Sequence, residues 1–167
     1  MDRLYFETKV LAEDNGAITG IGWKFSQADR IGDMIDADAF KGAVMPLPLL
    51  FGHDPSDPIG IWETAEAKGD SLQLSGKLLI DAVPRAREVF ALVKAGAVRG
   101  ISIGFATKRA VSRIGGGRTI KALELLEASL VTIPMHPGAR VTSAKDAVSA
   151  LRVAAAIQRA TAQLAAR

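Results

Sequence analysis

Short runs that alternate apolar and polar residues, separated by turn-forming residues, most constrain the fold of this chain. Residues 59–67 and 72–80 alternate in this way on either side of a Lys-Gly-Asp turn, which is typical of half-buried antiparallel strands. The runs 5–11 and 17–23 flank an Asn-Gly turn, which predicts a hairpin. We therefore expect a mainly β (α+β) protein.

One segment has the periodicity of an α-helix, residues 82–95. Asp81 is the predicted N-cap, Pro84 is tolerated in the first turn, and Gly96 is placed to end the helix. The apolar face of this helix consists of Ala86, Val89, Phe90, Leu92 and Val93. The chain after Gly96 is expected to enter a strand directly.

The end of the chain has a different composition. Residues 143–167 are rich in alanine, and their larger apolar residues recur at helical spacing. Ser143 and Asp146 fit the start of a helix. The predicted division is therefore a folded domain at 1–142 and an Ala-rich helical tail at 143–167. With so many small side chains, the tail is expected to pack weakly or only against a partner.

The composition excludes several classes of protein. A chain of 167 residues suits one domain with a single core. The absence of cysteine rules out a disulfide scaffold and a thiol nucleophile. The net charge is +3, with no basic stripe interleaved with aromatic residues, so no nucleic-acid partner is predicted. Because no signal peptide and no membrane-length apolar stretch is present, we expect a soluble intracellular protein without a membrane partner.

Two segments contain residues suited to acyl transfer. His53 follows an apolar run in Leu-Leu-Phe-Gly-His-Asp, and Ser102 lies in Gly-Ile-Ser-Ile-Gly-Phe. A neutral imidazole activates a serine hydroxyl by accepting its proton, and flanking glycines allow a substrate to approach closely. Taken alone, each residue has a structural explanation. His53 would serve as a turn residue bonded to Asp54 or Asp57, and Ser102 as a small residue beneath a packed helix.

A third segment, residues 124–134, supplies two carboxylates, Glu124 and Glu127. Base, nucleophile and acid are the three parts of a serine hydrolase. On a regular strand the two glutamates would point to opposite faces, so at most one could join His53 unless a β-bulge intervenes. Either is also explained as a solvated charge paired with Lys121 or an arginine. The residues alone support a hydrolase as a hypothesis.

A metal site is a weaker alternative. His53, Asp54, Asp57 and His136 contain imidazole and carboxylate groups of the kind that bind zinc or manganese. Their spacing matches no established zinc motif. We therefore predict no metal and no cofactor.

Over residues 5–142 the sequence resembles the prohead proteases of tailed bacteriophages, serine peptidases that mature viral capsids and are related in fold to herpesvirus assemblin. The resemblance rests on three blocks in this order: Gly52-His53-Asp54 followed by Ile59-Gly60, Arg99–Phe105, and Leu125–Pro134. The patterns Gly-x-Ser-x-Gly-Phe and Glu-x-Ser-x-Val-x-x-Pro are fairly specific in combination. One departure is Met135-His136, where many relatives have Ala-Asn.

This resemblance implies an antiparallel β-barrel of the assemblin type with surrounding helices and a C-terminal helix. It implies His53 as the base, Ser102 as the nucleophile and Glu127 as the third catalytic member. Glu124 lies close by, and assemblin uses a second histidine in this role, so Glu124 and His136 remain alternatives. By analogy with assemblin, a loop near residues 138–140 would bind the oxyanion.

The resemblance further implies a serine endopeptidase of phage or prophage procapsids, without a cofactor. Its implied substrates are the scaffolding segment of the major capsid protein, a scaffolding protein and the protease itself. It would act inside the assembling procapsid, in the cytoplasm of the bacterial host, as a homodimer or higher homo-oligomer. The tail would dock it into the shell or be self-cleaved. The rival hypotheses are an inactive capsid assembly or scaffolding protein on the same barrel, and a barrel that binds a small ligand.

Overall fold

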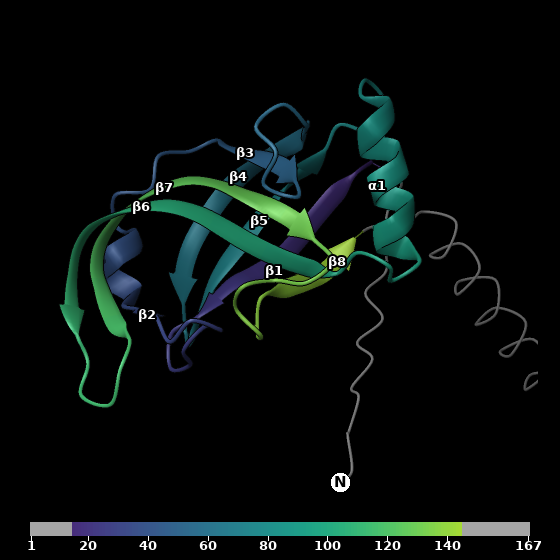
Figure 1. The fold of residues 1–167 in the computed structure, drawn as a ribbon. Coiled ribbons are helices and arrows are strands. Elements are labelled where there is room, and N and C mark those ends of the chain that lie inside the picture. The colour runs from purple at the N-terminus through teal and green to yellow at the C-terminus, as the bar shows by residue number, and fades with distance from the viewer. Residues whose placement is uncertain (1–14, 145–167) are drawn as a thin grey trace, which may run out of the picture.

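A computed structural model describes residues 15–144 of the chain (Figure 1). It contains eight strands, one 3-10 helix and one α-helix. In chain order these elements are β1 (Ala17–Lys24), β2 (Met34–Ile35), η1 (Ala37–Phe40), β3 (Leu47–Phe51), β4 (Pro58–Lys68), β5 (Ser71–Leu78), α1 (Pro84–Lys94), β6 (Gly100–Ser112), β7 (Arg118–Val131) and β8 (Arg140–Ala144). None of the described helices is long and apolar enough to cross a membrane.

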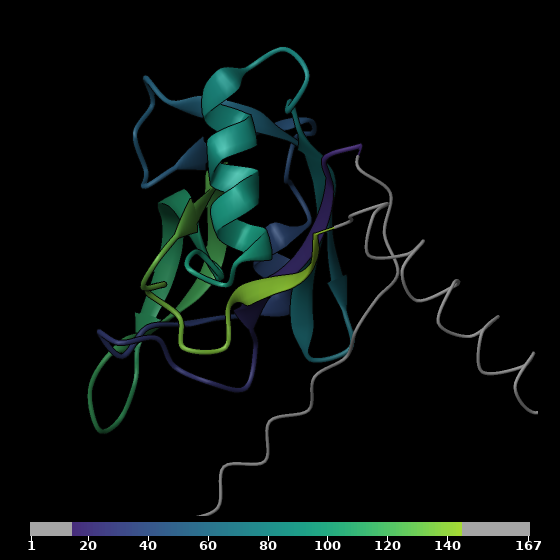
Figure 2. The same ribbon diagram turned by 90° about the vertical axis from the view of Figure 1, so that its right-hand side faces the viewer.

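Seven of the strands close into a barrel in the order β7-β3-β4-β5-β1-β8-β6, with β6 returning to β7. The long β6–β7 hairpin forms one wall, and α1 lies across one end of the barrel, beside β4, β5 and β8 (Figures 1 and 2). The predicted mainly β barrel is confirmed. Its pairings are antiparallel except that β3 and the short β2 run parallel to β7.

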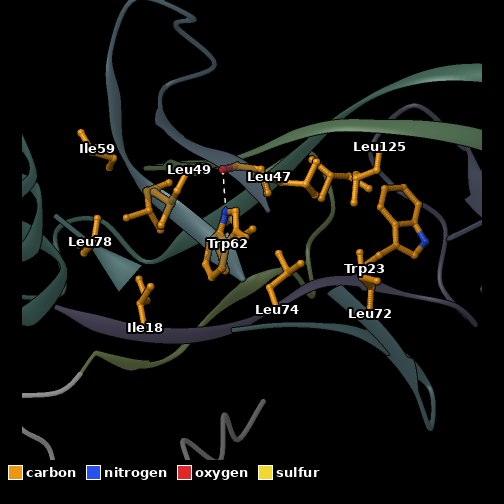
Figure 3. Close-up of a cluster of buried hydrophobic side chains, with 14 of the residues drawn as sticks. Ile18, Trp23, Leu47, Leu49, Ile59, Trp62, Leu72, Leu74, Leu78 and Leu125 are labelled. Atoms are coloured by element: carbon orange, nitrogen blue, oxygen red, sulfur yellow. Dashed lines mark hydrogen bonds between the residues drawn. The ribbon is translucent and has the colours of Figure 1, made fainter. Parts of the chain in front are cut away.

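The barrel interior is filled by the inward-facing side chains of every long strand. Trp62 on β4 lies at its centre among aliphatic residues such as Leu49 and Leu74 (Figure 3). The Trp62 indole Nε1–H donates to the carbonyl oxygen of Ala128 at 2.9 Å, so this buried donor has an acceptor. Burial of these side chains is the main stabilising contribution to a fold of this size.

The strand alternation predicted most of these elements. The strands expected at 59–67 and 72–80 correspond to β4 and β5, and the strand expected at 17–23 corresponds to β1. Among the described residues, β1 pairs with β5 and β8. The run 5–11, its predicted hairpin partner, lies outside the described residues.

Two predicted boundaries were wrong. The helix begins at Pro84 rather than at 82, and its N-cap is Val83 instead of Asp81. Pro84 occupies the first turn, where its missing N–H costs no hydrogen bond. On the predicted apolar face, Leu92 is exposed and the other four residues are buried.

The second error lies at the predicted start of the tail. Ser143 pairs with Thr19 as part of β8, so this strand continues past residue 142 and Ser143 does not begin a helix. Residues 145–167 lie outside the described residues. The division into a folded domain and a helical tail stays a prediction.

Candidate active site

The β6–β7 hairpin places Ser102 and Glu127 on the outer face of the barrel. Ile101 and Ile103 point into the core, so Ser102 between them points outward. Across the hairpin Ser102 pairs with Ser129, and Gly104 pairs with Glu127. The face outside the barrel therefore carries, on two adjacent strands, the nucleophile candidate, a second serine and a carboxylate.

A bulge in β7 decides which way Glu127 points. Gly104 pairs with Glu127 but Phe105 pairs with Leu125, so Leu126 is an extra residue without a partner. Leu125 and Ala128 both face the core, whereas Leu126 is 50% exposed. The bulge shifts the alternation by one residue, and Glu127 is directed outward beside Ser102.

His53 lies on the neighbouring side of β7. Strand β3 runs parallel to β7, with Leu50 opposite Ser129, and the chain turns sharply just after β3. Gly52 and His53 have φ values of 65° and 63°, the left-handed conformation, which is uncommon for a residue other than glycine. The His53 N–H donates to Ser129 Oγ at 3.1 Å, and the Gly52 N–H donates to the Leu130 carbonyl oxygen at 3.0 Å. The turn is therefore held against β7.

The carboxylate of Glu127 connects His53 with Ser129. Its Oε1 lies 2.7 Å from His53 Nδ1, and its Oε2 accepts the hydroxyl of Ser129 at 2.6 Å. The Glu127 side chain is 14% exposed and that of His53 is 44% exposed. Because Nδ1 faces the carboxylate, Nε2 is the ring nitrogen left to exchange protons with another group.

The position of Gly104 shows where the Glu127–His53 pair lies relative to Ser102. A Cβ atom at Gly104 would overlap Oε1 of Glu127, the same oxygen that contacts His53. The carboxylate therefore lies over β6, and it brings the imidazole to the face of β6 on which Ser102 lies two residues away.

The loop that carries His53 is also fixed from the side of α1. Arg85 donates from Nε to Asp57 at 3.2 Å and from Nη1 to Glu88 at 3.0 Å, and its guanidinium lies 4.7 Å from the centre of the Phe51 ring. The hydrogen bonds to Glu88 and Asp57 raise the pKa of Arg85 above its usual value. The loop between β3 and β4 is thus tied to a helix at one end and to β7 at the other.

The structure does not bring the other candidates for third member to His53. Glu124 forms an ion pair with Lys108 at 3.0 Å, and both side chains are more than half exposed. His136 is buried, with Nε2 3.1 Å from the Gln27 carbonyl oxygen and Nδ1 accepting the Gly138 N–H at 3.0 Å. Both ring nitrogens of His136 are therefore occupied, one within its own loop and one on Gln27.

Other sequence hypotheses are also corrected. Asp54 accepts the Ser56 N–H and Asp57 pairs with Arg85, so neither carboxylate is the partner of His53. Within residues 15–144 no group of three or more His, Asp or Glu side chains is placed to hold a metal. In the loop proposed for the oxyanion, the N–H of Gly138 donates to His136 Nδ1 and that of Ala139 to the His136 carbonyl oxygen. The N–H groups of Gly138 and Ala139 therefore already have acceptors within this loop.

Sequence reasoning gave no role to Ser129 or Arg85, and it interpreted Gly104 as room for a substrate rather than for the Glu127 carboxylate. In the sequence Ser129 is only one position of a motif, yet its hydroxyl contacts both Glu127 and the backbone of His53. Gly104 had a readable signal, because a glycine inside a strand often marks a close approach. No pattern in the sequence points to Arg85, since Arg85 lies on α1 and its partner Asp57 lies in the distant loop before β4.

The sequence of this chain is similar to those of known phage proteins. The sequence pattern of the family described as caudovirus prohead serine protease matches residues 5–153. A capsid polyprotein of Pseudomonas phage PAJU2 is 34% identical over 84% of this chain, and a prohead protease of Escherichia phage T5 is 32% identical over 71% of it. The aligned parts cover 22% and 58% of these two relatives, so the chain spans only part of their length.

The chain belongs to the caudovirus prohead serine protease family. This is a family of serine peptidases, and the match includes all of β1 to β8.

Proposed function

We propose that this protein is a serine endopeptidase of procapsid maturation, with Ser102 as nucleophile, His53 as general base and Glu127 as the third member. The observation that carries the proposal is the Glu127 carboxylate, which lies 2.7 Å from His53 Nδ1 and passes over Gly104, two residues beyond Ser102. A carboxylate in that position selects the imidazole tautomer that carries the proton on Nδ1 and stabilises the imidazolium.

The proposed reaction is acyl transfer to Ser102 followed by hydrolysis. Ser102 Oγ attacks the carbonyl carbon of the scissile peptide while His53 Nε2 accepts its proton. His53 then gives that proton to the leaving amine, and an acyl-enzyme remains. A water molecule, deprotonated by His53, attacks the ester carbonyl, and His53 returns that proton to Ser102 Oγ as the acid is released. Each backbone N–H aimed at the oxyanion would contribute about 10²- to 10³-fold to the rate.

We propose capsid components as the substrates: the scaffolding segment of the major capsid protein, a scaffolding protein and the protease itself. The family name and the relative named as a capsid polyprotein support this assignment. The site of action would then be the assembling procapsid in the bacterial cytoplasm, and homo-oligomers are proposed as the working form.

The decisive experiment is co-expression with the major capsid protein of the same phage or prophage, followed by gel electrophoresis and mass spectrometry. We expect wild type to remove a segment of the capsid protein and Ser102→Ala to leave it intact. Ser112→Ala is the matched control, because Ser112 is exposed and lies at the opposite end of β6 from Ser102. Processing by Ser102→Ala would contradict the proposal.

A second measurement does not depend on knowing the substrate. A fluorophosphonate should add to Ser102 in wild type, visible as a mass increase on one peptide, and should not label Ser102→Ala. An inactive assembly protein on the same barrel would form particles without labelling or processing. A ligand-binding barrel would show saturable binding and no labelling. Either result would replace the protease assignment.

A further inference from the structure

The connection between β7 and β8 has to cross the start of β6. Gly100, the first residue of β6, pairs with Val131 at the end of β7 on one side and with Arg140 at the start of β8 on the other. Residues 132–139 join these two flanking strands (Figure 1). A Cβ atom at Gly100 would lie 2.7 Å from Cδ of Pro134. The crossing segment therefore lies against the face of β6 to which a side chain at Gly100 would point.

This is the same face on which the proposed nucleophile lies. Gly100, Ser102 and Gly104 all face outward, because the residues between them point into the core. Pro134 lies over Gly100 on one side of Ser102, and the Glu127 carboxylate lies over Gly104 on the other side. Ser102 is only 5% exposed between these two neighbours. A substrate that reaches Ser102 from outside the barrel must therefore fit between Pro134 and the carboxylate with its imidazole.

The chemistry of acyl transfer indicates which part of the substrate faces Pro134. His53 has to give its proton to the leaving amine, so the amine side of the scissile bond lies toward His53. The carbonyl oxygen and the Cα of the acyl residue are the other substituents of the attacked carbon, and they lie away from the imidazole. Pro134 has no N–H that could bind the oxygen. The contact it offers is therefore to the side chain of the acyl residue.

The segment around Pro134 presents an apolar surface. Its two neighbours, Ile133 and Met135, are large apolar residues that are 74% and 45% exposed. Three consecutive apolar residues that stay accessible beside a nucleophile are typical of an interaction site rather than of a core. Residues 133–135 therefore suit contact with an apolar group.

Arg30 holds residues 133–135 in place from another loop. Its Nε donates to the Pro134 carbonyl oxygen at 3.1 Å, and its backbone N–H donates to the Met135 carbonyl oxygen at 3.2 Å. The loop of Arg30 is itself anchored, because Asp33 forms an ion pair with Arg118 of β7 at 2.9 Å. The position of the apolar segment over β6 is thus fixed by bonds that do not involve the catalytic candidates.

We propose that residues 133–135 contact the side chain of the residue whose carbonyl Ser102 attacks, and that they select an apolar side chain there, with Arg30 as a positioning residue. The inference rests on the proposed peptidase function. An apolar side chain gains by leaving water against this surface. A polar side chain loses its hydration there without gaining a hydrogen-bond partner from the three apolar side chains.

The test uses the full chain and peptides built on the cleavage site found in the capsid protein. The residue before the scissile bond is varied among leucine, asparagine, aspartate and lysine, and kcat/KM is measured for each. Leucine and asparagine have nearly the same shape, so their ratio reports polarity alone. We expect leucine to be cleaved at least about tenfold faster than asparagine. Aspartate and lysine should be slower still.

Two variants locate this preference on the crossing segment. Ile133→Asp should lower the leucine-to-asparagine ratio several-fold, and Pro134→Ala should lower it by removing the ring over Gly100. Ile114→Asp is the matched control, because Ile114 is fully exposed between β6 and β7, at the far end of the hairpin from Ser102. Its ratio should stay at the wild-type value. Because Ile133 is also exposed, Ile133→Asp keeps the test valid if Pro134→Ala fails to fold.

The positioning role of Arg30 has its own readout. Arg30→Ala should raise KM for the leucine peptide several-fold and change kcat less, because the reacting groups are untouched. Arg30→Lys keeps a donor for the Pro134 carbonyl oxygen and should restore part of the loss. Arg109→Ala, at an exposed position toward the far end of β6, should leave both constants unchanged.

The outcomes separate this inference from the function on which it rests. Fluorophosphonate labelling together with equal rates for leucine and asparagine would overturn the surface assignment alone. Aspartate cleaved fastest would do the same, since Arg30 would then be the recognising group. An unchanged ratio in Ile133→Asp and Pro134→Ala would also contradict the assignment. Absence of both labelling and cleavage would overturn the peptidase assignment and this inference with it.

Discussion

Ser129 donates its hydroxyl hydrogen to Glu127 at 2.6 Å, and the two residues lie on the same face of β7. The same hydroxyl oxygen accepts the backbone N–H of His53 at 3.1 Å. One fully buried serine therefore orients the carboxylate and also holds the turn that carries the imidazole. A change at Ser129 should affect the site without altering any group that exchanges protons with a substrate.

Ser129→Ala should lower kcat more than it raises KM. The change leaves a Glu127 oxygen and the His53 N–H without their partner, which also costs about 1–3 kcal/mol of folding free energy. Peptide cleavage and urea unfolding measure the two effects. Ser129→Thr keeps the hydroxyl and tests the hydrogen bond itself. Full activity in Ser129→Ala would show that the turn is held by its other contacts.

Glu127→Gln should reduce kcat by about 10²- to 10⁴-fold, because the amide can stabilise neither the required tautomer nor the imidazolium. The barrel should stay folded, as judged by circular dichroism. Glu124→Gln is the matched control on the same strand, since Glu124 is exposed and pairs with Lys108. If the two variants lost activity equally, Glu127 would not be the third member.

Gly104→Ala should reduce activity although it adds only one methyl group. The new Cβ would overlap Oε1 of Glu127 and displace the carboxylate from His53. Gly42→Ala is the matched control, because a Cβ there meets no atom within 4 Å. Steady-state kinetics of the two variants measure the difference. Normal kcat in Gly104→Ala would mean that the carboxylate can move without consequence.

Leu49→Ala should destabilise the barrel by about 2–5 kcal/mol, because it leaves a cavity in a well-packed core. Leu49 is 0% exposed and lies on β3 opposite Ala128, next to Trp62 (Figure 3). Leu126→Ala removes the same side chain from a position that is 50% exposed, and it should cost less than 1 kcal/mol. Equal losses in urea unfolding would contradict this assignment of the core.

The fold was predictable where a local pattern carries the information. Alternation predicted β4 and β5 because each strand buries one face, and periodicity predicted α1 because its apolar residues recur on one side. The strand β8 was missed because its five residues have no alternating pattern of their own. Its pairing with β1 is a long-range contact.

The candidate site was only partly predictable. His53, Ser102 and Glu127 were predicted from the motif blocks of the resembling family, whereas spacing alone left Glu124 and His136 as alternatives. A single extra residue in β7, Leu126, turns Glu127 to the outer face, and nothing in the local sequence indicates that bulge.

By itself the sequence determined the mainly β class, the length and order of most strands, and the chemical groups available for catalysis. These properties follow from side-chain polarity at short separations along the chain. Only the tertiary structure decided that His53 meets Glu127 and that Ser129 holds both. It also decided that His136 supports a loop. The reason is that each of these contacts depends on how distant strands pair, and strand register is set by packing of the whole barrel.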